Sequence, residues 1–193
     1  MLNNSLPSTT SSPFISVNRE AQLCFPHAWE QRKLGEVVER LDSLRIPITA
    51  SERISGNTPY YGANGIQDYV AGYTHRGEFI LIAEDGASDL DDYPTMCVSG
   101  TIWVNNHAHV IQGKPCMADN HYITWCLKRS DIKPILTGGT RAKLNAQALM
   151  GLNISIPSLA EQRQIGETFQ HLDDLITLHQ GEPSPLLTLI DTS

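Results

Sequence analysis

Short apolar runs separated by turn signals predict several β-strands in the middle of the chain. The continuous run FILIA at residues 79–83 is typical of a buried strand. Apolar stretches of similar length predict three more strands, at residues 96–98, 101–104 and 107–111. Ser99-Gly100 is the expected hairpin turn between the first two of these three strands.

The pattern ahead of these strands is less regular. Residues 29–38 (WEQRKLGEVV) predict a short helix that is interrupted at Gly35. Residues 56–62 (GNTPYYG) are rich in turn-forming residues, and Asn64-Gly65 is a second turn signal. We therefore expect turns over this part of the chain.

Helical signals follow the strands. Asp119 is the expected N-cap of a helix through HYITWCLKR (residues 121–129). Its apolar surface is expected from Ile123, Trp125 and Leu127. A glycine loop comes next, then a short helix from about Asn145 and a strand that ends at Pro157.

The last predicted element is a helix of about 22 residues that begins after Pro157 and ends before Gly181. Ser158 and Glu161 fit a capping box, in which both side chains satisfy free backbone N–H groups of the first turn. An apolar stripe at heptad spacing follows: Ile165, Phe169, Leu172, Ile176 and His179. Such a stripe most often packs against its own domain. Two heptads are too few to identify a coiled coil from the pattern alone.

These elements predict a mixed α/β (α+β) fold, with a mixed β-sheet and short helices in one domain. Ser, Thr, Asn and Pro dominate the first residues, which predicts a disordered leader. We expect a leader at 1–25, a domain at 26–157, the helix at 158–180, and a Pro-containing tail at 181–193.

The chain has 193 residues and a formal net charge of −7, which argues weakly against nonspecific nucleic-acid binding. The charge is unevenly distributed, because residues 84–92 are strongly acidic whereas residues 128–143 are mainly basic. No run approaches the roughly 20 apolar residues of a membrane-spanning helix, and the N-terminus has no secretory-signal pattern. Four cysteines without a CxxC pair predict reduced thiols in a cytoplasmic protein: Cys24, Cys97, Cys116 and Cys126.

The segment IWVNNHAHVI (residues 102–111) raises the question of a metal site. His107 and His109 would share one face of a strand. Asp119 and His121 follow, and zinc accepts imidazole and carboxylate ligands. The alternative is a polar strand face beside a bend at Asn105-Asn106, and no recognised ligand spacing such as HExxH is present.

Six segments, taken together, carry a resemblance to a known family: WEQRKLGEV (29–37), PYYGANGIQDYV (59–70), GEFILIAEDGA (77–87), GTIWVNNHAHVI (100–111), GGTRAKLN (138–145) and IPSLAEQRQIGETFQHLDDLITLHQ (156–180). In this order, and over roughly residues 26 to 180, they resemble the specificity (S) subunits of type I restriction–modification systems. The resemblance implies a DNA target recognition domain at 26–157 that reads a half-site. It also implies that the helix at 158–180 is a spacer and docking surface that pairs as a coiled coil.

The same resemblance implies that the chain has no catalytic residues, no metal and no cofactor of its own. Methyl transfer with S-adenosylmethionine belongs to modification subunits, and ATP- and Mg-dependent cleavage belongs to restriction subunits. A complete family member has two recognition domains, whereas this chain matches one. We therefore expect either a half-subunit that must pair or an inactive truncated form.

Candidate DNA-reading residues are those whose side chains can reach base edges or phosphates. The first group lies on the glycine loop that opens a helix: Thr140, Arg141, Lys143 and Asn145. A second loop offers Tyr60, Tyr61, Asn64 and Gln67, although the tyrosines could equally cover the core. Asn105 and His107 form the third group. The acidic run from Glu84 to Asp92 is expected to face away from phosphate, although Asp85 could accept from cytosine N4.

The expected partners are double-stranded DNA, modification subunits and a restriction subunit, without a membrane. A weak homodimer is expected through the helix stripe, at Ile165, Phe169, Leu172 and Ile176. The main alternative is a regulatory or truncated half-subunit that binds modification subunits without reading DNA. A metal-dependent enzyme is a third hypothesis.

Overall fold

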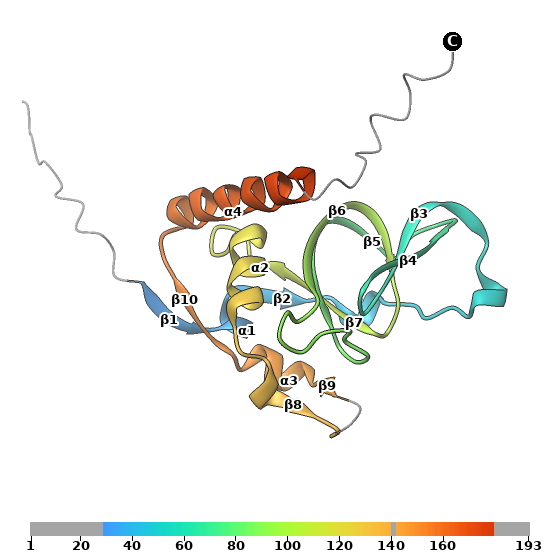
Figure 1. Cartoon of the computed structure of the whole chain (residues 1–193), viewed down its shortest axis with the longest axis horizontal. Coiled ribbons are helices and arrows are strands. Elements are labelled where there is room, and N and C mark those ends of the chain that lie inside the picture. Colours follow the sequence, from blue (N-terminus) through green and yellow to red (C-terminus); the bar gives the residue numbers. More distant parts are fainter. Residues whose placement is uncertain (1–28, 140–141, 180–193) are drawn as a thin grey trace, which may run out of the picture.

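The computed structural model of the protein describes residues 29–139 and 142–179 (Figure 1). A six-stranded sheet with the order β2-β7-β5-β6-β3-β4 lies at its centre. Its strands are β2 (Val38–Arg40), β3 (Ser55–Gly62), β4 (Gly65–Val70), β5 (His75–Ala83), β6 (Thr95–Val104) and β7 (Ala108–Gly113). β3 and β6 run parallel, whereas the other neighbouring strands are antiparallel. The predicted mixed α/β class with a mixed sheet is confirmed.

Shorter elements surround this sheet. Two small antiparallel pairs join β1 (Glu30–Lys33) to β10 (Asn153–Ile156), and β8 (Leu136–Thr137) to β9 (Lys143–Leu144). The helices are α1 (Leu34–Val37), α2 (Asn120–Arg129), α3 (Ala146–Met150) and α4 (Leu159–His179). Single 3₁₀ turns occur at Asp42–Leu44, Ala50–Glu52 and Lys133–Ile135.

β5 is buried on both faces, as its continuous apolar run predicts. Because successive side chains of a strand point to opposite faces, Ile80 and Ile82 enter one apolar cluster while Phe79 and Leu81 enter another. The first cluster includes α2 and the C-terminal elements, and the second lies between β5, β6 and β7. The run at residues 79–83 therefore holds the middle of the domain together.

Two predictions about strands are wrong because long-range pairing overrides local turn signals. Ser99-Gly100 is no hairpin turn, since β6 continues through it with Glu78 and Gly77 of β5 opposite. Residues 56–62 form most of strand β3. Pro59, which has no N–H, is tolerated there because pairing with β6 begins only at Tyr60.

The helix predicted over residues 29–38 is also wrong. Glu30–Lys33 is a strand that pairs with Asn153–Ile156, and only the single turn Leu34–Val37 is helical. Gly35 lies close to α3, where an added Cβ would be 3.2 Å from Met150 Cβ. The Asn64-Gly65 turn is confirmed, because it joins β3 to β4 and Gly65 has φ of +107°.

The predicted helix starts are confirmed. Each start is determined by a capping residue and the few residues that follow it in the sequence. The Asp119 carboxylate accepts from Tyr122 N at 3.0 Å, and Asn145 caps α3 by accepting from Gln147 N. The capping box of α4 forms between Ser158 and Glu161. α4 is 21 residues long, close to the predicted length.

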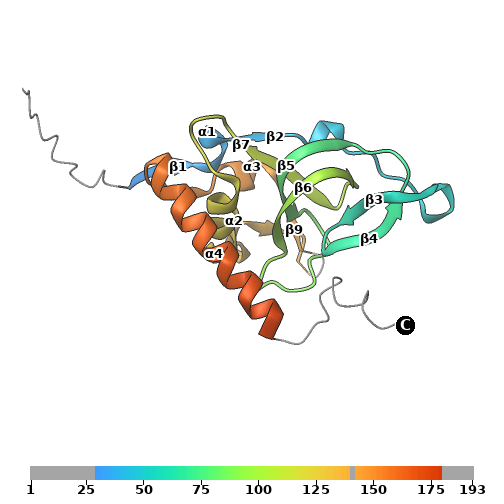
Figure 2. The same cartoon turned by 90° about the horizontal axis from the view of Figure 1, so that it is seen from above.

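α4 lies along α2 in both views (Figures 1 and 2). Gln162 is buried at this junction and accepts from Asp119 N while donating to the carbonyls of Met117 and Pro157. One turn later Gly166 allows close approach, since an added Cβ would meet His121 Cβ at 2.9 Å. The first half of α4 is therefore part of the domain rather than a free spacer.

No helix in residues 29–139 and 142–179 is long and apolar enough to cross a membrane. The three described cysteines are free, with Cys97 and Cys126 partly buried and Cys116 exposed. The expected leader, the fourth cysteine Cys24 and the tail after His179 lie outside the described residues.

Candidate DNA interface

Polar segments that are distant in the sequence meet around the loop after β5. Glu84 N donates to His107 O at 2.8 Å, and Glu84 O accepts from Leu144 N at 2.7 Å. Asp85 forms a β-bridge with Lys143. Two further hydrogen bonds tie Asn64 to the same loop, from its Nδ2 to Gly86 O and from Ser88 N to its Oδ1. At least one described member of each predicted group of DNA-reading residues therefore borders this loop.

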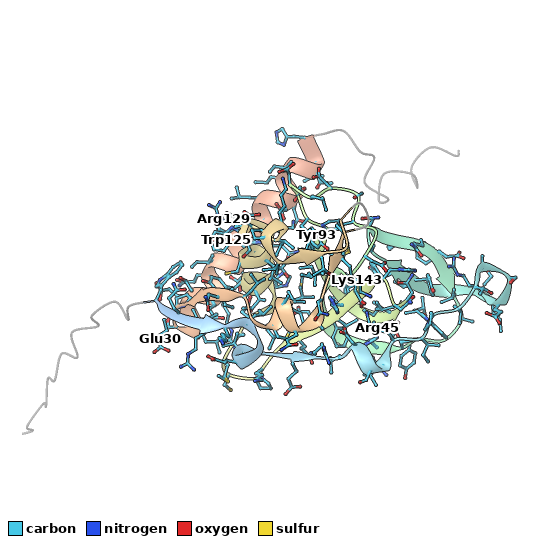
Figure 3. All side chains as sticks on the ribbon, turned by 90° about the horizontal axis from the view of Figure 1, so that it is seen from below. Glu30, Arg45, Tyr93, Trp125, Arg129 and Lys143 are labelled. Carbon is cyan, nitrogen blue, oxygen red and sulfur yellow. The ribbon has the colours of Figure 1, made fainter. Side chains whose placement is uncertain are left out.

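Lys143 is held at this surface by Glu84. Its Nζ lies 2.9 Å from Glu84 Oε1, and Arg45 Nη1 lies 2.8 Å from Glu84 Oε2. Figure 3 labels Arg45 and Lys143 near one another. Burial opposes ionisation of Glu84, yet the hydrogen bonds from Arg45 and Lys143 outweigh it and lower the pKa of this carboxyl group. The Lys143 side chain remains 49% exposed, so its ammonium can still meet a phosphate.

Beneath Glu84 lies a buried hydrogen-bonded pair between β7 and the first 3₁₀ turn. The His109 Nδ1 atom is 2.8 Å from Asp42 Oδ2, and its Nε2 is 2.9 Å from Leu144 O. Asp42 Oδ1 also accepts from Val110 N at 2.8 Å. Burial works against the charge of Asp42, but the bonds from His109 and Val110 lower the pKa of its carboxyl group. Since Leu144 follows Lys143, this pair positions the strand that carries the lysine.

The third group of candidate residues is linked to the second. His107 Nδ1 contacts Asp85 Oδ1, and His107 N donates to Asn105 Oδ1 at 2.8 Å. Asn105 is buried, and its Nδ2 donates to Gln67 Oε1 at 3.2 Å. Asn105 therefore orients the segment, whereas exposed Gln67 and partly exposed His107 offer hydrogen-bonding atoms at the surface.

The two tyrosines have different environments. Tyr60 is 1% exposed, its hydroxyl donates to Ile48 O, and Arg53 lies 4.2 Å above its ring. Its prediction as a DNA-reading residue is a poor fit, because burial leaves no free edge for a base. Tyr61 is half-buried against the second apolar cluster, and burial raises the pKa of its hydroxyl. Both tyrosines mainly support the β3–β4 hairpin.

The glycine loop is only partly described. Thr140 and Arg141 lie outside the described residues, so their DNA role stays a prediction. Asn145 is exposed, but its side chain caps α3. Within the described part of this loop, Lys143 offers a half-exposed ammonium group that is paired with Glu84.

The acidic run at residues 84–92 was expected to face away from phosphate, but its first two residues lie beside candidate DNA-reading residues. Glu84 and Asp85 occupy the middle of the surface, beside Lys143 and His107. The expectation holds better for Asp91, which pairs with Lys133 rather than with the loop at Lys143. The acidic and basic segments are separate in the sequence, but folding brings part of the acidic run beside the basic Lys143.

The metal site considered for His107, His109, Asp119 and His121 does not assemble. His107 contacts Asp85 at the surface, while His109 is buried against Asp42. Asp119 caps α2, and His121 lies beside Glu78 with Nε2 to Oε2 at 3.4 Å. The four side chains occupy separate places, since the histidines lie on different elements with their own partners.

The helix stripe is divided between two environments. Ile165 packs on the domain core, and Phe169 stacks on Trp125 with ring centroids 4.6 Å apart. Leu172 and Ile176 are 45% and 53% exposed, and Leu175 and Leu178 beside them are exposed as well. The first half of the predicted pairing stripe is therefore occupied within the chain, and the second half presents an exposed apolar surface.

Sequence reasoning missed Asp42, Arg45 and the supporting role of Glu84. Their partners lie 39 to 68 residues away, so local periodicity gives no signal for them. The isolated acidic and basic residues at 42–45 were the available hint, but such residues are usually solvated.

The domain combines a mixed sheet, a surface with exposed polar side chains, and a final helix with an exposed apolar end. The family model described as type I restriction modification DNA specificity domain matches residues 26–187. The chain belongs to this family. Its resemblance to the specificity subunits, first seen in six short segments, is thereby confirmed.

Known proteins agree with this assignment. A Haemophilus influenzae protein that carries the name of a type I restriction enzyme specificity subunit is 46% identical over 136 residues, which is 70% of this chain and 35% of that protein. The crystal structure of the S subunit from M. genitalium superposes with a TM-score of 0.63 at 16% identity, over 76% of this chain and 39% of that chain. The HsdS subunit of Thermoanaerobacter tengcongensis gives 0.51 at 13% identity, over 86% and 43%. These structural likenesses show the fold, and the chain spans about a third to two fifths of its relatives.

Proposed function

We propose that the chain reads one DNA half-site and directs modification and restriction subunits to it. The observation that carries this proposal is the meeting of Lys143, Gln67 and His107 around one loop, although they come from three distant segments. A cation suits phosphate, while amide and imidazole groups suit base edges in the major groove. A surface that combines both kinds of group is what half-site recognition needs.

The chain itself performs no chemistry in this proposal. Methyl transfer with S-adenosylmethionine and cleavage with ATP and Mg belong to the partner subunits. The net charge of −7 fits a division of labour, in which a basic partner supplies much of the phosphate affinity and this chain supplies sequence discrimination.

The exposed end of α4 is the proposed docking surface for a second copy or a modification subunit. It is made of Leu172, Leu175, Ile176 and Leu178, and we call these four residues the apolar end of α4. Pairing of two copies there would give a two-fold assembly that reads an interrupted palindrome, because the symmetry of the protein imposes symmetry on the target. A surface this short predicts a weak homodimer.

A second candidate function is a half-subunit that binds modification subunits without reading DNA. The observation in its favour is that Glu84 and Asp85 place negative charge at the centre of the candidate interface. Both functions use the apolar end of α4, so assembly alone does not separate them.

Methylation mapping tests the proposal. A host should carry modification subunits with this chain as its one specificity subunit, and its genome should be read for methylated bases. We expect one methylated motif that disappears when the gene for this chain is removed. Assembly with modification subunits without any such motif would instead support the second candidate.

A further inference from the structure

We propose that Glu78, Cys97 and His121 form a binding site for a zinc-like divalent cation. Glu78 lies on β5, Cys97 on β6, and His121 in the first turn of α2. This cluster differs from the set of ligands that the sequence suggested, with which it shares only His121. The proposal is independent of DNA recognition.

The distances between the ligand atoms suit a tetrahedral ion. His121 Nε2 lies 3.4 Å from Glu78 Oε2 and 4.0 Å from Cys97 Sγ, and all three ligand atoms lie within 4.8 Å of one another. Zinc bonds of about 2.0–2.3 Å at tetrahedral angles separate ligand atoms by roughly 3.3–3.8 Å. Small side-chain rotations would therefore close the site without moving the backbone.

The fold fixes where these three side chains point. Cys97 is opposite Ile80 in the β5–β6 register, so Glu78, two residues from Ile80, lies diagonally across on the same face. Asn120 Nδ2 donates to Glu78 Oε1 at 2.8 Å and leaves Oε2 toward His121. Such a hydrogen bond to the outer oxygen of a carboxylate is a common support for a metal ligand.

The types of ligand suit a divalent cation. Glu78 offers a carboxylate oxygen and Cys97 a sulfur, which binds a metal as the thiolate. When the cation binds, the Sγ–H bond breaks, the proton leaves to solvent, and the sulfur electron pair forms the bond to the metal. Thiolate and carboxylate together then balance the two positive charges.

The site has room for a fourth ligand. A cavity of about 220 Å³ borders Cys97 and His121 and extends to Trp125 and Phe169 between α2 and α4. Three protein ligands leave the fourth coordination position of a tetrahedral ion open, and a water molecule can occupy it. A bound ion would join β5 and β6 to α2, the helix on which α4 packs. Its expected role is to stabilise the domain rather than to catalyse a reaction.

Cobalt titration of the purified full-length chain tests the site directly. A thiolate–cobalt bond produces a charge-transfer band in the near ultraviolet, and we expect one equivalent of Co²⁺ to produce it and Zn²⁺ to abolish it. Cys97→Ser should remove the band, and His121→Gln should weaken binding at least tenfold. Cys126→Ser is the matched control, because Cys126 is also partly buried but lies away from the cluster, and it should keep the band.

Two further measurements use the unmodified chain, so their results do not depend on whether the variants fold. Calorimetry in buffers of different ionisation enthalpy should show release of about one proton per Zn²⁺ at pH 7. Zinc at about 100 times its dissociation constant should raise the melting temperature by roughly 5 °C or more. A band that survives in Cys97→Ser, or zinc binding without proton release, would overturn the proposal.

Discussion

Lys143 Nζ lies 2.9 Å from Glu84 Oε1, while the other oxygen of the same carboxylate accepts from Arg45 Nη1 at 2.8 Å. One partly buried acid thus holds two cations from segments that are far apart in the sequence. The arrangement orients Lys143 but also offsets its charge in the free protein. A DNA phosphate must therefore compete with Glu84 for the ammonium group.

Lys143→Ala should weaken DNA binding by a similar factor for every sequence. If Lys143 contacts one phosphate, the slope of log K against log salt should become shallower by about one. The measurement is a salt titration of DNA binding with the modification subunit present. Lys133→Ala is the control, since Lys133 is exposed and paired with Asp91 away from the interface. An equal loss in both variants would mean that only net charge matters.

Gln67→Ala and Tyr60→Ala should separate DNA reading from support of the fold. Gln67 is exposed, so its removal should relax one target position at a cost of about 1–3 kcal/mol in binding. Because Asn105 Nδ2 loses its acceptor, the free energy of unfolding should fall by only about 0.5–1.5 kcal/mol. Tyr60 is buried, so its removal should cost about 3–5 kcal/mol of unfolding free energy. Urea unfolding and a binding assay over single-base variants of the target measure the two effects. A Gln67→Ala variant with unchanged specificity would move base reading to other residues.

The elements that could be predicted from the sequence are those determined by neighbouring residues. The apolar run at 79–83, the Asp119 cap and the capping box at Ser158 all form as expected. Strand β1 and the full length of β6 were missed, because their partners lie far along the chain. In both segments, sheet pairing is stronger than the local preference for helix or turn.

The candidate site shows the same limit. Residue type alone identified Lys143, Gln67 and His107, since their side chains suit phosphates and bases. Their convergence on Glu84 and Asp85 depends on hydrogen bonds between segments that local patterns do not connect. The buried position of Tyr60 could not be predicted for the same reason, because a tyrosine in a turn-rich sequence suits either surface or core.

Asp42→Asn should reduce stability at neutral pH and flatten its decline in acid. Hydrogen bonds from His109 and Val110 overcome the burial of Asp42 and lower its pKa in the folded state below the ordinary 3.8. A depressed folded pKa stabilises the fold above the unfolded pKa, and this contribution is lost as pH falls through the folded value. We expect a cost of about 1.5–3 kcal/mol at pH 7. The difference between wild type and variant should shrink below about pH 4.

Urea unfolding of wild type and Asp42→Asn between pH 7 and pH 3 checks this expectation. Asp91→Asn serves as the control, because Asp91 is highly exposed and should change stability little. A difference that stays constant down to pH 3 would show that Asp42 acts through packing instead of charge.

The apolar end of α4 allows assembly to be tested without damage to the domain. Phe169 stacks on Trp125, so Phe169→Asp would disturb the junction of α4 with α2 and confuse folding with pairing. Leu172 and Ile176 are exposed, and Leu172→Asp together with Ile176→Asp should leave the melting temperature nearly unchanged. The same double variant should abolish self-association and reduce binding of the modification subunit, because charges at the centre of an apolar contact lose their hydration. Light scattering at several concentrations, with and without the modification subunit, measures both effects.

Gln164→Asp on the exposed surface of the first half of α4 is the matched control and should assemble normally. If the double variant assembles like the wild type, the apolar end of α4 is not the docking surface, and partners must bind elsewhere on the domain.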